Sequence, residues 1–207
     1  MKKALILIII AIVCVQCGVN QQIKQMQALE NCKYQITSAD SIYLANTDIS
    51  KMINSNGFNL ESAPGLAFAF LQRKIPLKAR LNLQITNPGK SEAGINEFEY
   101  KVMIKDQEIT NGRIDQKVTI PANGGVTIVP IIIDQNIYPL LSKASNRNAL
   151  VNFFSNEAEE KTMVTLKIKP SIGLGGEKIQ YPGFVDIKKE VSNKQLISSI
   201  RELTDSW

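Results

Sequence analysis

Few side chains in this 207-residue chain could do chemistry, because it contains three cysteines and no histidine. Without histidine, Ser-His-Asp and Cys-His catalysis are excluded, and the commonest zinc and copper ligand is missing. Cys14 and Cys17 belong to the N-terminal region, which leaves Cys32 without a second cysteine for an internal disulfide. Nothing is present to activate or resolve Cys32 as a redox nucleophile, so we expect a buried or quiet thiol.

Two other patterns suggest ligand binding but have simpler explanations. Gly173-x-Gly175-Gly176-x-Lys178 has part of a phosphate-binding loop, yet such a loop follows a strand, opens a helix and has Ser or Thr after the lysine. A hairpin turn is expected there instead. Glu157, Glu159 and Glu160 lack the spaced Asp/Asn/Gly pattern of a cation loop, which favours a solvated acidic loop. Two charged pairs, Asp40 with Asp48 and Asp115 with Lys117, offer nothing beyond an ordinary protein surface. The sequence therefore predicts no catalytic, cofactor or metal site.

The N-terminus has the proportions of a secretory signal. Lys2 and Lys3 precede an unbroken apolar run from Ala4 to Val15, which is too short to span a bilayer comfortably. Gln16-Cys17-Gly18 follows, and a cysteine at this point resembles the lipobox of bacterial lipoproteins. In those proteins the signal peptide is removed and the new N-terminal cysteine carries acyl chains such as palmitate. The resemblance therefore implies lipidation at Cys17.

Two alternatives to this interpretation stay open. Gln16 and Cys14 depart from the lipobox pattern, and Cys14 is a rival acceptor, although Val13 is a poor residue before the cut. The N-terminus could also be an uncleaved anchor with both cysteines in lipid. Either way, a soluble domain is expected at a bacterial cell envelope, facing the periplasm, with the outer membrane favoured over the inner. Two or three acyl chains would hold it essentially permanently, since each buried methylene contributes about 0.8 kcal/mol.

Composition sets further bounds on the mature protein. Removing residues 1–16 leaves about 190 residues, enough for one domain with a full core. The net charge falls from +5 to about +3 because Lys2 and Lys3 are lost. Acidic and basic residues are interspersed, so nucleic acid is not an expected partner. The expected partners are the membrane, through the acyl chains, and a hydrophobic ligand or an envelope protein.

Alternation of apolar and polar residues predicts a mainly β protein. The clearest strand is 78–86, which Asn87-Pro88-Gly89 ends as a turn. Other strands are expected at 33–44 with a break at Ser38–Ser41, 98–104, 109–120 with a bulge at Gly112, 126–133 buried on both sides, 164–168 closed by Pro170, and 178–187. Hairpin or turn residues are expected at 105–108 and 121–125. About seven strands at this spacing predict a β-sandwich.

Helical insertions interrupt the strands. One is expected over 47–73, where Thr47 or Asp48 caps a first piece and Ala63–Leu71 forms a second. The apolar face of the second piece is predicted to include Leu66, Phe68, Phe70 and Leu71. One or two short helices are expected over 135–154. The expected organisation is a signal peptide (1–16), a tether or marginal helix (17–32), the sandwich domain (33–191) and a C-terminal helix (192–207).

A series of central residues resembles a known family. It comprises Leu81-Asn82-Leu83-Gln84-Ile85-Thr86-Asn87-Pro88, Phe98-Glu99-Tyr100-Lys101-Val102, Gly112, Ile120-Pro121-Ala122 and Val129-Pro130. This series resembles the late-embryogenesis-abundant (LEA) type 2 family, or water-stress and hypersensitive-response (WHy) domain, in its bacterial lipoprotein branch. The match is close over 78–133 and loose over 33–188. The insertions at 47–76 and 135–160 depart from the compact form of the family.

The resemblance implies an immunoglobulin-like β-sandwich, no enzymatic activity and an association with stress protection. The matching residues are structural, so no functional residue is carried over. The favoured hypothesis is a membrane-anchored, non-catalytic envelope lipoprotein with a stress-protective, structural or binding role. The alternative is a carrier or chaperone of hydrophobic ligands. In it, Ala63–Leu71 lines a lipid-sized cleft, or presses on the membrane with Arg73 and Lys74 at headgroups, instead of closing one end of the core.

Overall fold

A computed structural model of the chain describes residues 24–25, 27–54, 57–58, 64–155, 158–174 and 177–195. Within these residues, no helix combines the length and the apolar character needed to cross a bilayer. The predicted signal peptide and the acceptor cysteines Cys14 and Cys17 lie outside the described residues.

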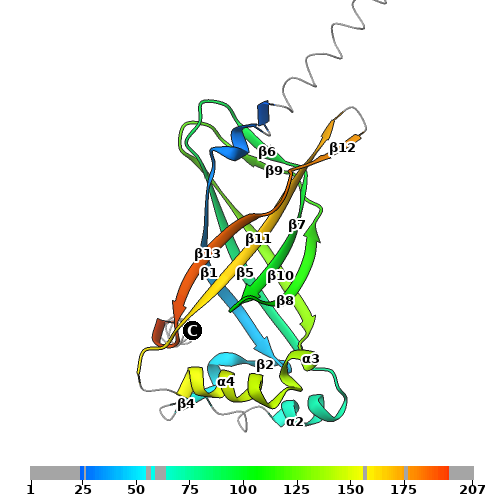
Figure 1. Cartoon of the computed structure of the whole chain (residues 1–207), viewed down its shortest axis with the longest axis vertical. Helices are drawn as coiled ribbons and strands as arrows, with labels where there is room; N and C mark the ends of the chain where they lie inside the picture. The colour runs from blue at the N-terminus through cyan, green and yellow to red at the C-terminus, as the bar shows by residue number, and fades with distance from the viewer. Residues whose placement is uncertain are drawn as a thin grey trace, which may run out of the picture.

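Two antiparallel sheets face one another (Figure 1). Sheet I has the order β10 (Gly125–Asn136), β5 (Pro76–Asn87), β1 (Lys33–Leu44) and β2 (Thr47–Asp48). Sheet II runs from β8 (Gln107–Ile114) through β7 (Glu97–Ile104) to β11 (Lys161–Leu174), and the far side of β11 pairs with β13 (Val185–Ser192) and β12 (Glu177–Gln180). The chain crosses between the sheets repeatedly, which gives the predicted immunoglobulin-like β-sandwich.

The strands form because each has one apolar face to bury. In β5, Leu81, Leu83 and Ile85 point inward while their neighbours stay partly exposed, as the alternation predicted. The inward side chains of both sheets form one core, and its fully buried members include Leu83, Ile85, Ile131, Phe98, Leu166 and Ile168. The described residues contain seven strands of eight residues or more, in agreement with the predicted number.

Helices gather at one end of the sandwich (Figure 1). We call this end the cap; it comprises the 3-10 helix η1 (Ile49–Met52), α2 (Pro64–Leu71), α3 (Tyr138–Leu141) and α4 (Ala144–Ser155). The N-terminal helical residues 24–25 and 27–30 lie at the opposite end, beside the short pair β6 (Ala93–Ile95) and β9 (Val118–Ile120). We call this the tether end. The two short helices expected over 135–154 are confirmed as α3 and α4.

The first helical piece predicted over 47–73 is wrong. Thr47 and Asp48 pair with the end of β1 as strand β2 instead of opening an α-helix. After the single 3-10 segment η1, the chain forms another short pair, β3 (Ile53–Asn54) with β4 (Gly57–Phe58). β-branched residues, Asn and Gly are weak helix formers, and pairing with an existing strand satisfies the backbone better here.

Three details of the predicted strands are also wrong. The 109–120 strand ends at Ile114, and Val118–Ile120 pairs with β6 instead of β7. Gly112 is not a bulge, since it stands directly opposite Tyr100; the register shift lies between Val102 and Met103. The strand at 126–133 is buried on one face only, because its other face belongs to the exposed outer face of sheet I.

Pro170 does not close its strand, because β11 continues to Leu174. Pairing with β13 stops at Ile168 and pairing with β12 starts at Ser171. The missing N–H of proline therefore falls where β11 changes partners, and this placement makes proline tolerable inside the strand.

The predicted turns are confirmed, whereas the cap of the C-terminal helical residues was not predicted. Lys105 and Asp106 form the hairpin turn with positive φ angles of 47° and 63°. The predicted break in β1 is an irregularity in its pairing with β5 between Asp40 and Tyr43. At the C-terminal end, Ser192 accepts the Gln195 backbone N–H while the Gln195 side chain accepts that of Ser192, which is a capping box. Residues 193–195 are helical, and the remainder of the predicted C-terminal helix lies outside the described residues.

Candidate functional site

The cap has its own hydrophobic core beneath α2. Leu66 and Ala69 turn inward and pack with buried residues from the neighbouring segments: Leu44, Ala45, Met52, Ile75, Ile137, Leu141 and Phe153. The described part of the 63–71 segment therefore closes one end of the sandwich, as the simpler interpretation predicted.

The predicted apolar face of α2 is only partly correct. Leu66 is buried and Phe70 is half-buried, but Phe68 is 61% exposed and Leu71 is 83% exposed. Residues 66, 69 and 70 share one face of a helix, and this face meets the cap core. Phe68 and Leu71 lie on another face and project into solvent, which a search for apolar residues alone could not distinguish.

The end of α2 places basic residues beside these two side chains. The Lys74 N–H donates to Ala69 O at 2.9 Å, and the Arg73 N–H donates to Phe70 O at 3.0 Å. These two hydrogen bonds form a Schellman motif. Arg73 has the left-handed φ of 55° that this motif needs. Both side chains are exposed and make no ion pair within the described part of the chain.

The rest of the cap is also basic. Its described segments 49–52, 64–75 and 137–155 contain five cationic residues and no Asp or Glu: Lys51, Arg73, Lys74, Lys143 and Arg147. Arg147 is used internally, because its guanidinium donates to Leu141 O and Ser142 O at 2.8 and 2.9 Å and stacks over the Phe70 ring. The nearest carboxyl residues in the sequence are Asp48 and Asp134, outside these segments, and Glu61 and Glu157, outside the described residues.

At the tether end, the N-terminal helical residues are docked on the sandwich. Leu29 is buried in the main core, and its carbonyl oxygen accepts the Tyr34 hydroxyl at 3.0 Å. The Gln25 side chain donates to Glu92 at 3.0 Å. The chain therefore enters the sandwich at a fixed place, opposite the cap.

The other residues named from the sequence have structural surroundings. Cys32 is buried, its Sγ donates to Ala28 O at 3.4 Å, and burial raises the pKa of the thiol, as expected for a quiet cysteine. The glycine-rich run lies between the paired strands β11 and β12, which confirms a hairpin, with Gly175 and Gly176 themselves outside the described residues. Lys178 forms an ion pair with Glu97.

The acidic residues weighed as cation ligands in the sequence form no metal site in the described part of the chain. No group of three or more His, Cys, Asp or Glu side chains there is arranged to hold a metal ion. Glu159 and Glu160 lie in a loop before β11, and Glu157 is outside the described residues. Asp40 is 3.8 Å from Arg80 and also accepts from Asn82, whereas Asp115 pairs with Arg113 and not with Lys117.

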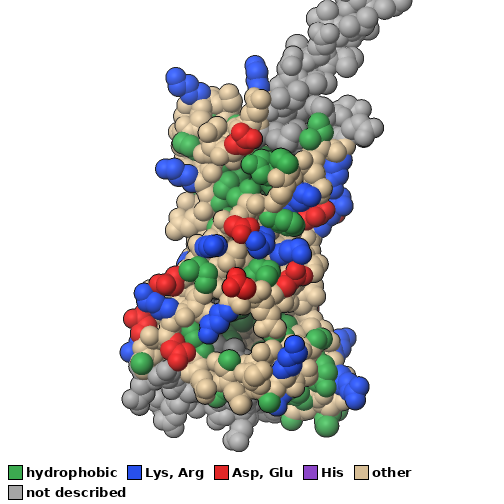
Figure 2. Space-filling view, in the orientation of Figure 1, with side chains coloured by type: hydrophobic (Ala, Val, Ile, Leu, Met, Phe, Trp, Pro, Cys, Tyr) green, Lys and Arg blue, Asp and Glu red, His purple; other side chains and the backbone are tan. Residues whose placement is uncertain are grey.

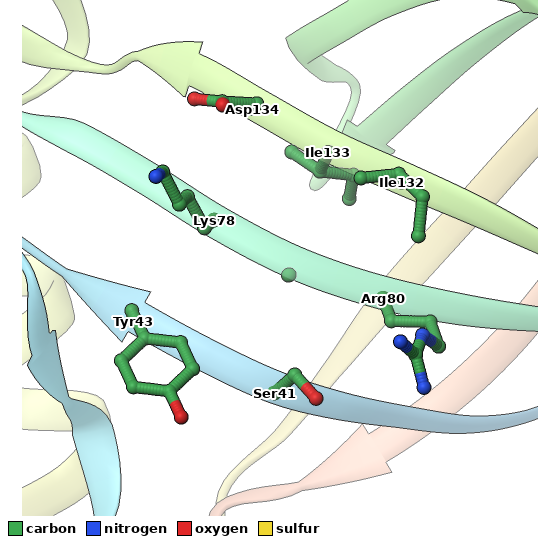
Figure 3. Close-up of a pocket in the computed structure, with 8 residues that line it drawn as sticks. Ser41, Tyr43, Lys78, Arg80, Ile132, Ile133 and Asp134 are labelled. Carbon is green, nitrogen blue, oxygen red and sulfur yellow. The ribbon is translucent and has the colours of Figure 1, made fainter.

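A shallow groove of about 220 Å³ lies on the outer face of sheet I (Figure 3). It is lined by β1, β5 and β10 residues, namely Ser41, Tyr43, Lys78, Ala79, Arg80, Ile132, Ile133 and Asp134. Pockets for small molecules usually enclose about 300–1,000 Å³. The groove is smaller, and it lies on an outer sheet face instead of between the sandwich and the 63–71 segment, where the carrier hypothesis needs a cleft.

Comparison with known proteins identifies no family for the chain. No protein-family model matches the sequence, and no curated protein matches it. Solved structures with a distant likeness include the following three. A protein from Archaeoglobus fulgidus is 15% identical, with a TM-score of 0.37 over 56% of this chain and 83% of its own. A candidate LEA protein, At2g46140.1, is 12% identical, with a TM-score of 0.38 over 92% of this chain and 87% of its own. AT1g01470 from Arabidopsis thaliana is 14% identical, with a TM-score of 0.43 over 77% of this chain and 78% of its own. At TM-scores below 0.5, these likenesses assign neither a family nor a function.

Proposed function

We propose that this chain is a membrane-anchored, non-catalytic lipoprotein of the bacterial cell envelope, whose β-sandwich has a structural, stress-protective or binding role. The main support is the N-terminal sequence, with its basic start, apolar run and Cys17. Docking of residues 27–32 at one end of the sandwich adds to this, because an anchor there would hold the domain by a defined end.

The LEA type 2 assignment is part of this proposal and rests on the sequence motif. The structure gives the motif residues structural roles. Asn87 is fully buried, its side-chain amide donates to Ser91 O and Ile120 O, and its Oδ1 accepts the Gly89 N–H at 2.9 Å. The Asn-Pro motif therefore ties three chain segments together at the tether end. Such roles fit a protein whose motif residues maintain a fold instead of forming a reaction centre.

Metabolic labelling with a palmitate analogue tests the anchor. We expect the wild-type protein to be labelled and to sediment with membranes. Cys17→Ser should abolish labelling and leave a longer, unprocessed chain. Cys32→Ser is the matched control and should be labelled normally, because the Cys32 thiol is buried.

Continued labelling of Cys17→Ser that disappears on Cys14→Ser would move the acceptor to Cys14. An unlabelled wild-type protein in the soluble fraction would overturn the proposal. If the protein is labelled and sediments with membranes, density-gradient separation of inner and outer membranes tests the expected outer-membrane location.

Native mass spectrometry separates this proposal from the carrier hypothesis. If side chains fill the core, no lipid can bind inside it. The domain released from detergent should then carry no stoichiometric lipid beyond the covalent acyl chains. A co-purified lipid that survives removal of the anchor would instead support a carrier of hydrophobic ligands.

A further inference from the structure

We infer that the tip of the cap is a contact site for an anionic lipid bilayer. The exposed side chains of Phe68 and Leu71 are three residues apart on α2 and therefore share one face of the helix. The tip is defined here as Phe68, Leu71, Arg73 and Lys74. Its two apolar side chains are suited to enter the boundary between headgroups and acyl chains.

The charges around the tip match an anionic surface. Arg73 and Lys74 follow directly on the same helix end, and Lys51 and Lys143 add two more cations to the cap. None of the four forms an ion pair with a described residue. In Figure 2, basic and hydrophobic side chains gather without acidic ones at the lower right, over the α2 end of the cap. Each cation near an anionic bilayer raises affinity roughly fivefold.

A lipid surface fits this tip better than an acidic protein does. A stable protein interface buries about 800 Å² per partner, and its centre is depleted of charged residues. Here two apolar side chains are surrounded closely by cations at the end of an elongated domain, which allows shallow insertion but offers no broad apolar patch. A lipid bilayer needs only that shallow contact.

The position of the tip determines which bilayer it can meet. Strand β11 has 14 residues and spans about 46 Å, at about 3.3 Å per residue, between the cap and the tether end. Even fully extended, the stretch from Cys17 to Lys24 reaches at most about 25 Å. When the sandwich stands on its anchor, the tip therefore faces a second lipid surface. This step, unlike the lipid contact itself, rests on the proposed function.

A two-vesicle capture experiment tests the inference with the full chain. The protein is reconstituted into neutral phosphatidylcholine vesicles, and flotation of these vesicles reports anchoring. Fluorescent vesicles are then added, either of phosphatidylcholine alone or containing phosphatidylglycerol, and their capture is measured. We expect capture of the phosphatidylglycerol vesicles and its strong reduction by high salt, which shortens the Debye length from about 10 Å to about 3 Å.

The variants distinguish the tip from general stickiness. Phe68→Ser/Leu71→Ser should lower capture by about tenfold or more, and Arg73→Gln/Lys74→Gln by a similar factor. Val126→Ser/Ile132→Ser is the matched control, because these apolar residues are about half exposed but lie on sheet I. Circular dichroism verifies that each variant is folded.

Capture that is unchanged by Phe68→Ser/Leu71→Ser, or equal for neutral and anionic vesicles, would overturn the inference. Absence of capture would do the same and would leave an acidic protein as the partner to seek. If the protein fails to float with the first vesicles, the proposed anchor falls. Direct binding of the full chain to phosphatidylglycerol vesicles then still tests the tip.

Discussion

The Tyr100 hydroxyl donates a hydrogen bond of 3.1 Å to the backbone carbonyl oxygen of Ile132. Tyr100 lies on β7 of sheet II and Ile132 on β10, the edge strand of sheet I, so this bond joins the two layers. Gly112 stands directly opposite Tyr100 on β8, where an added Cβ would lie 2.6 Å from the Tyr100 hydroxyl oxygen. The glycine thus makes room for the ring whose hydroxyl links the sheets.

Replacing Tyr100 with Phe removes only the hydroxyl group. The variant should lose about 1 kcal/mol of unfolding free energy, because the Ile132 carbonyl loses its partner from the opposite sheet. For a domain of this size, that corresponds to a fall in Tm of about 2–4 °C. Thermal unfolding measures the loss. Tyr43→Phe is the control, since Tyr43 is 39% exposed, and its Tm should stay nearly unchanged. Equal Tm values for both variants would contradict the link between the sheets.

Gly112→Ala should destabilise the domain through a collision with Tyr100. Three atoms of the Tyr100 side chain, the hydroxyl oxygen and two ring carbons, lie within 3 Å of the added Cβ, so the side chain must move away from Ile132. The expected loss is about 1–3 kcal/mol by urea unfolding. In a Tyr100→Leu background, the same substitution should cost much less, because the colliding atoms are gone. A cost that is the same in both backgrounds would show that another contact is responsible.

Asn87→Ala should be among the more damaging single substitutions in the described domain. It leaves the Ser91 and Ile120 carbonyl oxygens and the Gly89 N–H without the Asn87 side chain, at a fully buried position. Each buried polar group left without a partner costs about 1–3 kcal/mol. Asn82→Ala is the control, since Asn82 is partly exposed on the outer face of sheet I. Denaturant midpoints should fall far more for Asn87→Ala.

Much of the fold could be predicted because it depends on short-range pattern. Strict alternation in 78–86 specified β5, and Asn, Gly and Pro marked the turns at 87–89 and 121–125. The errors share a cause. Burial on one or both faces, and the partner of a short strand, depend on tertiary position. For this reason β10 was predicted to be buried on both faces, although its outer face is exposed.

The contacts that close the sandwich were not predictable either. Lys189 resembles any surface lysine in the sequence, yet its ammonium donates to Ile36 O and Thr37 O at 2.9 and 2.8 Å and joins β13 to β1. The exposed pair on α2 required the helix phase, since residues 64–71 are apolar almost throughout. Long-range carbonyl partners and helix phase leave no local signal.

The Glu97 carboxylate should make stability depend on pH at acidic values. Its pKa is lowered to about 2 from an ordinary 4.5, mainly by the hydrogen bond from Lys178, with further contributions from Ser171 and Arg113. A lowered pKa in the folded state means that this stabilisation is complete above about pH 4.5 and is lost as the pH falls toward 2.

Glu97→Gln should therefore be less stable than the wild type at pH 7, and the difference should shrink steadily below pH 4.5. Urea unfolding at a series of pH values measures this. Lys178→Gln removes the largest cause and should reproduce part of the effect. A stability difference that is constant from pH 7 to pH 2.5 would rule out the ion-paired carboxylate as its source.

Arg73→Gly should stabilise the domain while weakening the lipid contact. Arg73 adopts the left-handed φ of 55° at the end of α2, a conformation that costs an L-residue about 1 kcal/mol and glycine almost nothing. We expect unfolding free energy to rise by up to about 1 kcal/mol, because the Schellman hydrogen bonds to Ala69 and Phe70 are retained. Lys74→Gly, outside the left-handed position, should give no such gain although it removes the same charge. If both variants also bind anionic vesicles less well, then the arginine is kept at a strained position for its charge. A loss of stability in Arg73→Gly would contradict the strain, and undiminished vesicle binding would contradict the role of its charge.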